Sequence, residues 1–339
     1  MINHFKLTFR LLFDRRVSLW LKLFTFLPPL AYLAFPTPDD IVPILWILDD
    51  ALVFAAFSWL FVRMAPGDVL NEQRARVQGM MPSEAMRQLN AMRYPDESKH
   101  FAIGVGITLA ILTVGGYLVG LVGALVFGLV YLGTLISRGG LMGNAVRVTE
   151  KHLPDLYQIL QAAQANLPPV KVNLFVTQNP ALNAFAFGHN EPYTIVLTSA
   201  LVERLTPIEL QAVIGHEMGH ILFEHVRLTS FMAGAPGLLQ LLFYQWSRSC
   251  EYSCDAAALV SVGNDPRPVC SVMLKLASGL STDRLDVDAF MEQFDESSEI
   301  LSGEWLQTHP MLVKRVKRIR QLVQGTTGNF QPAAAPVAA

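Results

Sequence analysis

The segment that most constrains this chain is His216-Glu217-Met218-Gly219-His220, an H-E-x-x-H motif. Residues four apart lie on one face of an α-helix, one turn from each other, so His216 and His220 can both direct a ring nitrogen at one metal ion. Glu217 lies about 100° around the helix from His216, within reach of a water on that metal. Two imidazoles, an oxygen ligand from elsewhere and an open position for water suit a catalytic zinc ion. A carboxylate beside activated water is typical of peptide hydrolysis.

The residues before the motif favour a helix. Thr206-Pro207-Ile208-Glu209 combines an N-cap residue, a proline at the first helical position and a capping-box glutamate. We therefore expect a helix from about Thr206 to about His225. The motif alone also allows a simpler interpretation, a buried helix whose two histidines make structural hydrogen bonds.

The composition of the 339-residue chain is richer in apolar residues than that of an ordinary soluble protein. Hydrophobic residues make up 52% and charged residues 16%. The net charge of −2 gives no indication of a nucleic-acid partner. Cys250, Cys254 and Cys270 are odd in number and lack zinc-finger spacing, so we expect reduced thiols and not metal ligands.

Residues 1–65 are predicted to anchor the chain in a membrane. A short basic segment opens this region, and two apolar stretches follow it, residues 17–35 and 41–64. The first stretch has no small-residue cleavage site after it, which favours an uncleaved anchor over a secretory signal. Asp49-Asp50 interrupts the second stretch. Because each acid at mid-bilayer costs on the order of 3 kcal/mol, that stretch either turns within the membrane or directs the pair into a polar interior.

Residues 66–100 are predicted to form a polar connection that carries a short helix from about Ser83 to Met92. Residues 101–137 are then expected to enter the membrane, as a hairpin or as one long tilted span. Residues 101–136 carry no charged side chain, and they are too many for one span of about 20 residues.

The choice between hairpin and single span decides on which side of the membrane the motif lies. A hairpin keeps the motif on the side of the basic residues that flank the predicted spans, which the positive-inside rule places in the cytoplasm. A single span would put it outside. We expect the hairpin, and hence an integral protein of the plasma or inner membrane whose catalytic domain is cytoplasmic.

Residues 138–325 are predicted to form an α+β domain, mostly helical with a small sheet. Apolar spacing predicts a first helix, alternation predicts an extended segment after it, and two more extended segments flank a turn at residues 189–192 before the motif helix. These elements lie at residues 152–165, 170–177, 183–188 and 193–197. Residues 326–339 are rich in Gly, Pro and Ala and are expected to be a disordered tail.

The last predicted helix begins near Thr308 and is strongly basic. Its apolar stripe comprises Leu312, Val316, Ile319 and Val323. Its basic residues are Lys314, Arg315, Lys317, Arg318 and Arg320. The basic residues form either a solvated face or a surface that contacts anionic lipid headgroups.

Two histidines do not complete a zinc site, and Glu251 is the best candidate for the third ligand. It lies downstream of the motif on a second predicted helix, and Asp255 follows one turn later on the same face. Asp255 could accept a hydrogen bond from the free N–H of a ligand histidine, which would fix the tautomer of that histidine.

Five motifs occur in one order along residues 145–322. They are Asn183-Ala-Phe-Ala186, Thr198-x-x-Leu201, Glu209-Leu-x-Ala-Val-x-x-His-Glu-x-Gly-His220, Ser247-Arg-x-x-Glu-x-x-Cys-Asp255 and Thr308-His-Pro310. This series resembles the membrane zinc metallopeptidases of the HtpX and CAAX prenyl-protease type, within the gluzincins. The resemblance implies a gluzincin-type domain that binds one Zn²⁺ ion through His216, His220 and Glu251, with Glu217 as the general base.

The resemblance adds two roles and shows two departures. It implies that Asn183 lies on an edge strand and hydrogen-bonds the backbone of an extended substrate. It implies that His309 helps to hold the substrate or the developing oxyanion. Cys254 stands where the family usually has a small residue such as Ala, and we expect it to serve packing. The N-terminal membrane region also differs from the usual membrane part of the family.

Together these features predict an integral-membrane zinc endopeptidase that hydrolyses peptide bonds of membrane or misfolded proteins. Its expected partners are protein or peptide substrates and the lipid bilayer, without nucleic acid. One alternative is a prenyl-protein processing protease, but that needs a large intramembrane chamber, and this chain has at most about four candidate spans. The other is a non-catalytic membrane scaffold that retains the fold, which the complete set of ligands and base disfavours.

Overall fold

The computed structural model describes residues 2–14, 84–104, 143–188, 191–226, 237–280, 286–292 and 309–326, with scattered residues among 17–77, residue 107 and residues 139–140. The chain divides into two compact units, Met1–Ala91 and Met92–Ala339. The predicted disordered tail and most of the three predicted membrane segments lie outside the described residues. None of the helices in the described ranges has both the length and the apolar character that crossing a membrane requires.

The first unit contains α1 (Ile2–Phe13) and most of α5 (Glu84–Met92), the helix predicted between Ser83 and Met92. Leu11 of α1 is fully buried in an apolar cluster that includes Phe61. Within the same unit, the Thr8 and Ser58 hydroxyl oxygens are 2.9 Å apart, which satisfies two polar groups beside this cluster.

The second unit contains a four-stranded mixed sheet in the order β1-β2-β4-β3. The strands are β1 (Val146–Arg147), β2 (Val172–Thr177), β3 (Ala184–Phe187) and β4 (Tyr193–Thr198). β2 and β4 are parallel, whereas β1 and β3 pair antiparallel to their neighbours. The three predicted extended segments are confirmed as β2, β3 and β4, and β3 forms one edge of the sheet.

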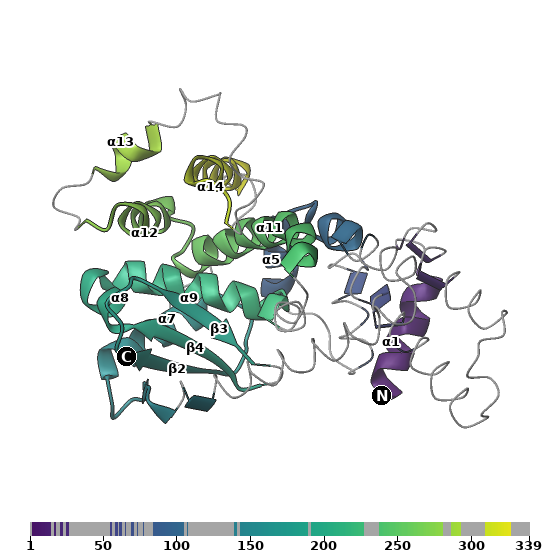
Figure 1. Cartoon of the computed structure of the whole chain (residues 1–339), viewed down its shortest axis with the longest axis horizontal. Coiled ribbons are helices and arrows are strands. Elements are labelled where there is room, and N and C mark those ends of the chain that lie inside the picture. Colours follow the sequence, from purple (N-terminus) through teal and green to yellow (C-terminus); the bar gives the residue numbers. More distant parts are fainter. Residues whose placement is uncertain are drawn as a thin grey trace. The chain divides into compact units, whose positions relative to one another are not determined.

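A helical segment at residues 97–104 belongs to this unit. Seven helices whose bounds are described complete it. They are α7 (Pro154–Ala165), α8 (Ser199–Arg204), α9 (Pro207–Leu222), α11 (Gly237–Ser261), α12 (Pro266–Ser278), α13 (Val287–Glu292) and α14 (Leu312–Thr326). α9 lies along the sheet, and α11, α12 and α14 lie on the side of α9 away from it (Figure 1). A mostly helical domain with a small mixed sheet agrees with the predicted fold class.

The motif helix starts where the sequence predicts. The backbone N–H of Thr206 donates to Glu209 Oε2 at 2.7 Å, as a capping box requires. α9 ends at Leu222, three residues before the predicted end, because Glu224 adopts a left-handed φ of 64° and turns the chain. His225 therefore follows the helix and is not part of it.

Candidate metal centre

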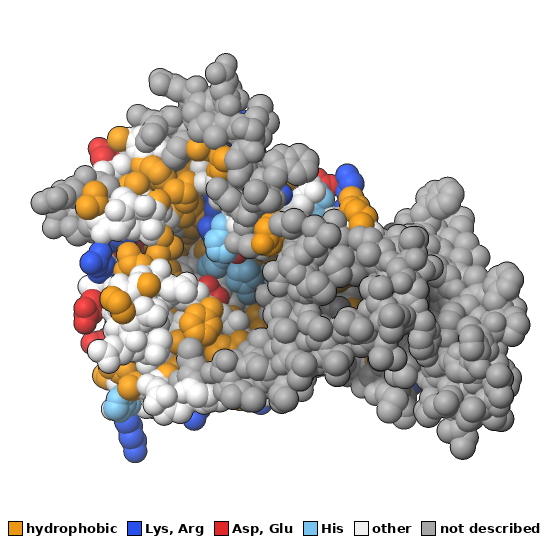
Figure 2. Space-filling view, viewed as in Figure 1, with side chains coloured by type: hydrophobic (Ala, Val, Ile, Leu, Met, Phe, Trp, Pro, Cys, Tyr) orange, Lys and Arg blue, Asp and Glu red, His pale blue; other side chains and the backbone are white. Residues whose placement is uncertain are grey.

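A cleft of about 680 Å³ lies between the sheet edge and the helical layer. β3, α9, α11, α12 and the residues leading into α14 all contribute to its wall. Figure 2 shows histidine and acidic side chains in this hollow, with apolar side chains around it. Polar groups that converge inside a largely apolar cleft are typical of an active site.

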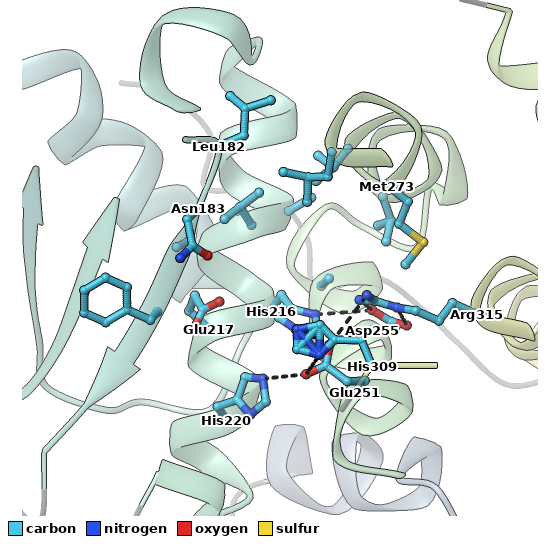
Figure 3. Close-up of a pocket in the computed structure, with 18 of the residues that line it drawn as sticks. Leu182, Asn183, His216, Glu217, His220, Glu251, Asp255, Met273, His309 and Arg315 are labelled. Carbon is cyan, nitrogen blue, oxygen red and sulfur yellow. Dashed lines mark hydrogen bonds and ion pairs between the residues drawn. The ribbon is translucent and has the colours of Figure 1, made fainter. Parts of the chain in front are cut away.

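The two motif histidines and Glu251 meet in this cleft. Nε2 of His216 is 3.4 Å from Glu251 Oε2, and Nε2 of His220 is 3.6 Å from Glu251 Oε1. The histidine ring centroids are 5.1 Å apart on successive turns of α9, and Glu251 comes from α11 (Figure 3). Two imidazole nitrogens and one carboxylate that face a common point fit a catalytic zinc ion.

Asp255 lies one turn beyond Glu251 and contacts the other nitrogen of His216. Nδ1 of His216 is 3.2 Å from Asp255 Oδ1, so the Nδ1–H can donate to this carboxylate, and Nε2, which faces Glu251, is the nitrogen that a metal ion would take. Arg315 donates to both oxygens of Asp255, from Nη2 at 2.6 Å and from Nε at 2.9 Å. Asp255 is fully buried, and burial alone would raise its pKa, but Arg315 and His216 hold that pKa below its ordinary value.

Glu217 lies on the side of α9 that faces β3, in the same cleft. Its side chain is buried, and burial raises the pKa of the carboxyl above its ordinary value, although the neighbouring His220 and His216 oppose the shift. A buried carboxyl beside two histidines and Glu251 is suited to exchanging protons.

Asn183 and His309 line opposite parts of the cleft, at the sheet edge and before α14. The backbone of Asn183 is fixed by Thr198, whose hydroxyl lies 3.1 Å from the Asn183 N–H and 3.0 Å from the Asn183 carbonyl oxygen. The side chain of His309 is 67% exposed, with Nδ1 3.9 Å from Glu251 Oε1. The structure therefore brings both residues to the cleft that holds the metal-ligand candidates.

Arg315 belongs to the site, although its place among basic residues did not indicate this. The basic residues of its helix predicted a solvated or lipid-facing surface, but only 14% of the Arg315 side chain is exposed and it pairs with Asp255. Helical spacing carried the relevant information. Arg315 lies three residues after Leu312 and four before Ile319, so it belongs to the apolar stripe that faces the core.

Cys254 is nearer to the metal-ligand candidates than its expected packing role suggests. Its sulfur lies within 4.8 Å of ligand atoms of His216 and His220, so it is a geometric alternative to Glu251. Burial raises the pKa of the Cys254 thiol well above its ordinary value, and the nearby Glu251 charge raises it further. Zinc binds the thiolate, whereas the Glu251 carboxylate already faces both Nε2 atoms, so Glu251 fits better.

The family model and the two relatives that match this chain here are all described as peptidases or proteases. Residues 156–242 and 226–323 match the model of peptidase family M48. The chain is 35% identical over 224 residues to "Plastoglobule-localized metallopeptidase 48, chloroplastic" of Arabidopsis thaliana, a match of 57% of this chain and 64% of that protein. It is 35% identical over 133 residues to a "Protease HtpX homolog" of Streptococcus pyogenes serotype M49 (strain NZ131), a match of 37% of this chain and 44% of that protein. These matches span less than two thirds of either relative.

Among solved structures, the chain is similar to Ste24p of S. mikatae, with 13% sequence identity and a TM-score of 0.35. That similarity covers 90% of this chain and 100% of the other.

Proposed function

Because the chain belongs to peptidase family M48, we propose that it is a membrane-held, zinc-dependent endopeptidase that cleaves membrane or misfolded proteins. One observation carries this proposal: Nε2 of His216, Nε2 of His220 and the Glu251 carboxylate face a common point. A zinc ion held there would supply the Lewis acidity that activates water and polarises a carbonyl group.

Glu217 is the general base in this proposal. It lies in the same cleft as the three ligands, on the side of the sheet edge. Its carboxylate takes a proton from the attacking water and delivers that proton to the leaving amine. The buried setting of Glu217 favours this proton transfer, because bulk water has little access to the carboxylate.

β3 is the strand on which we place the substrate. It pairs only with β4 in the described sheet, so one side of its backbone is open to an extended peptide. Asn183 directly precedes this strand and lines the cleft, where its side-chain amide can bond the substrate backbone. His309 lies on the other wall and would contact the substrate from there.

The first test is cleavage of an unfolded protein by the detergent-purified full chain with zinc supplied. Glu217→Gln should keep zinc and lose turnover, because the amide cannot take a proton from water. Glu203→Gln is the matched control, since Glu203 is exposed on α8 outside the cleft. Normal cleavage by Glu217→Gln would show that the mechanism is wrong. If the wild type and the Glu203→Gln control both bind zinc but cleave nothing, a non-catalytic scaffold would be favoured.

A further inference from the structure

A series of hydrogen-bonded polar groups leads from Nδ1 of His220 away from the cleft. Nδ1 of His220 is 3.3 Å from Nδ1 of His225, and Nε2 of His225 is 2.8 Å from Glu97 Oε1. His225 and Glu97 are each 1% exposed. Glu97 lies in the second compact unit but before residue 156, where the match to the peptidase family starts.

The carboxylate of Glu97 is fully occupied by partners in the same unit. Arg93 contacts both of its oxygens, with Nε 3.2 Å from Oε2, and the hydroxyl of Ser253 donates to Oε2 at 2.5 Å. Burial alone would raise the pKa of Glu97, but Arg93 and His225 hold that pKa well below its ordinary value. Glu97 is therefore a charged carboxylate that only accepts hydrogen bonds.

The ionised carboxylate of Glu97 determines the position of every proton in this series of hydrogen bonds. A neutral imidazole has one N–H and one lone pair. Since Glu97 only accepts, His225 donates from Nε2 and keeps its lone pair on Nδ1. His220 then donates from Nδ1 to His225, and its own lone pair is left on Nε2, the atom that faces Glu251. The thiol of Cys254, 3.5 Å from His225 Nδ1, can only be a second, weak donor to the same lone pair.

The hydrogen bonds that start at Nδ1 of His220 follow the same order as those that start at Nδ1 of His216, with one additional imidazole. His216 donates from Nδ1 to Asp255, which Arg315 holds by two hydrogen bonds. His220 donates from Nδ1 through His225 to Glu97, which Arg93 holds. We propose that His225 and Glu97 are positioning residues of the metal centre, which fix the tautomer and ring orientation of the zinc ligand His220. This inference rests on the proposed zinc site.

Glu97, His225 and Cys250 also satisfy the distances of a separate metal site. The positive charge of Arg93 against Glu97 opposes a second cation there, and both carboxylate oxygens already accept hydrogen bonds. A closed network of this kind orients a neighbour and does not bind an ion. The segment before the family match is thus part of the metal centre.

The test measures the zinc dissociation constant of the full chain by competition with a chromogenic chelator. His225→Phe keeps a ring of similar size and leaves Glu97 with Arg93 and Ser253, but removes the acceptor for His220. A second variant, Arg93→Met with Glu97→Leu, removes both members of the ion pair together, so that neither charge is buried alone. Both variants should bind zinc about 10- to 100-fold more weakly, the usual effect of losing a group that orients a metal ligand.

Glu209→Gln is the matched control, because Glu209 is an equally buried, ion-paired carboxylate on α9 that contacts no ligand candidate. Its zinc affinity should equal that of the wild type. Nitrogen-15 shifts of labelled histidines should show His220 with its proton on Nδ1 in the wild type, and this preference should be lost in His225→Phe, which a purely structural role of His225 would not cause. Wild-type zinc affinity in both His225→Phe and the double variant would overturn the inference while leaving the zinc site intact. Failure of the wild type to bind zinc would overturn the proposed zinc site itself.

Discussion

Gly219 of α9 lies directly against the backbone of Cys254 in α11. A Cβ atom on Gly219 would be 3.0 Å from the Cys254 Cα and 2.9 Å from the Ala257 Cβ. One turn earlier, a Cβ atom on Gly215 would be 2.5 Å from the Ser261 Cβ. The two glycines therefore let the histidine-bearing helix approach the helix that carries Glu251 and bring the ligand candidates together.

Gly219→Ala should push α9 and α11 apart at the metal centre. Overpacking of this kind costs about 1–3 kcal/mol, and here the displaced neighbours include backbone atoms that cannot rotate away. We expect a lower unfolding free energy and weaker zinc binding, measured by denaturant titration and chelator competition. Gly143→Ala is the control, because nothing lies within 4 Å of its added Cβ. Unchanged zinc affinity in Gly219→Ala would contradict the proposed role of close helix contact.

Arg315→Met should damage both stability and the metal centre. It would leave the fully buried Asp255 without its cationic partner, and breaking a buried pair this way costs about 3–5 kcal/mol. Since Asp255 orients His216, zinc affinity should also fall, by roughly 10- to 100-fold. Denaturant unfolding and chelator competition measure the two effects. Lys317→Met, at an exposed position of the same helix, should change neither.

The apolar wall of the cleft should select the side chain that lies beside the scissile bond. Val269, Val272 and Met273 of α12 line it and are nearly buried. Met273→Asn should lower kcat/KM about 10-fold or more for peptides with Leu or Phe beside the scissile bond. The effect should be smaller for peptides with Ala at that position. Leu280→Asn, an exposed apolar position outside the cleft, is the control. An equal loss for all peptides would argue against a specificity pocket.

Local periodicity explains which parts of this molecule were predictable. His216, Glu217 and His220 are within two turns of one helix, so spacing alone placed them together, and the same rule applied to Glu251 and Asp255. The same spacing places Arg315 on the apolar stripe of α14, between Leu312 and Ile319.

Contacts between distant segments were not predictable in this way. Glu97 reaches His225 across 128 positions of sequence, and no local pattern at Glu97 distinguishes it from a surface residue. The first extended segment was recognised by alternation and the next two by the turn signal between them, but the order β1-β2-β4-β3 depends on which strands meet after folding. The predicted domain boundaries stay a prediction.

The ion pair between Glu209 and Lys275 should make stability depend on pH. The two groups are 2.6 Å apart and nearly fully buried, and they join the start of α9 to α12. Burial alone would raise the pKa of Glu209, but hydrogen bonds from Lys275, Ser271 and Thr206 hold it below its ordinary value of 4.5. The ionised form is therefore favoured in the folded state. Its contribution is present above about pH 4.5 and is lost as the pH falls through the lowered folded pKa.

Glu209→Gln tests this dependence, because glutamine keeps the size of the side chain and leaves Lys275 without a counter-charge. Near pH 7 the variant should be less stable than the wild type by on the order of 3 kcal/mol. That difference should shrink as the pH falls from about 4.5 through the lowered folded pKa, where the wild-type carboxylate becomes neutral as well. Denaturation midpoints of both proteins across this pH range measure it. A difference that stays constant down to acid unfolding would mean that the charge of Glu209 does not stabilise the fold.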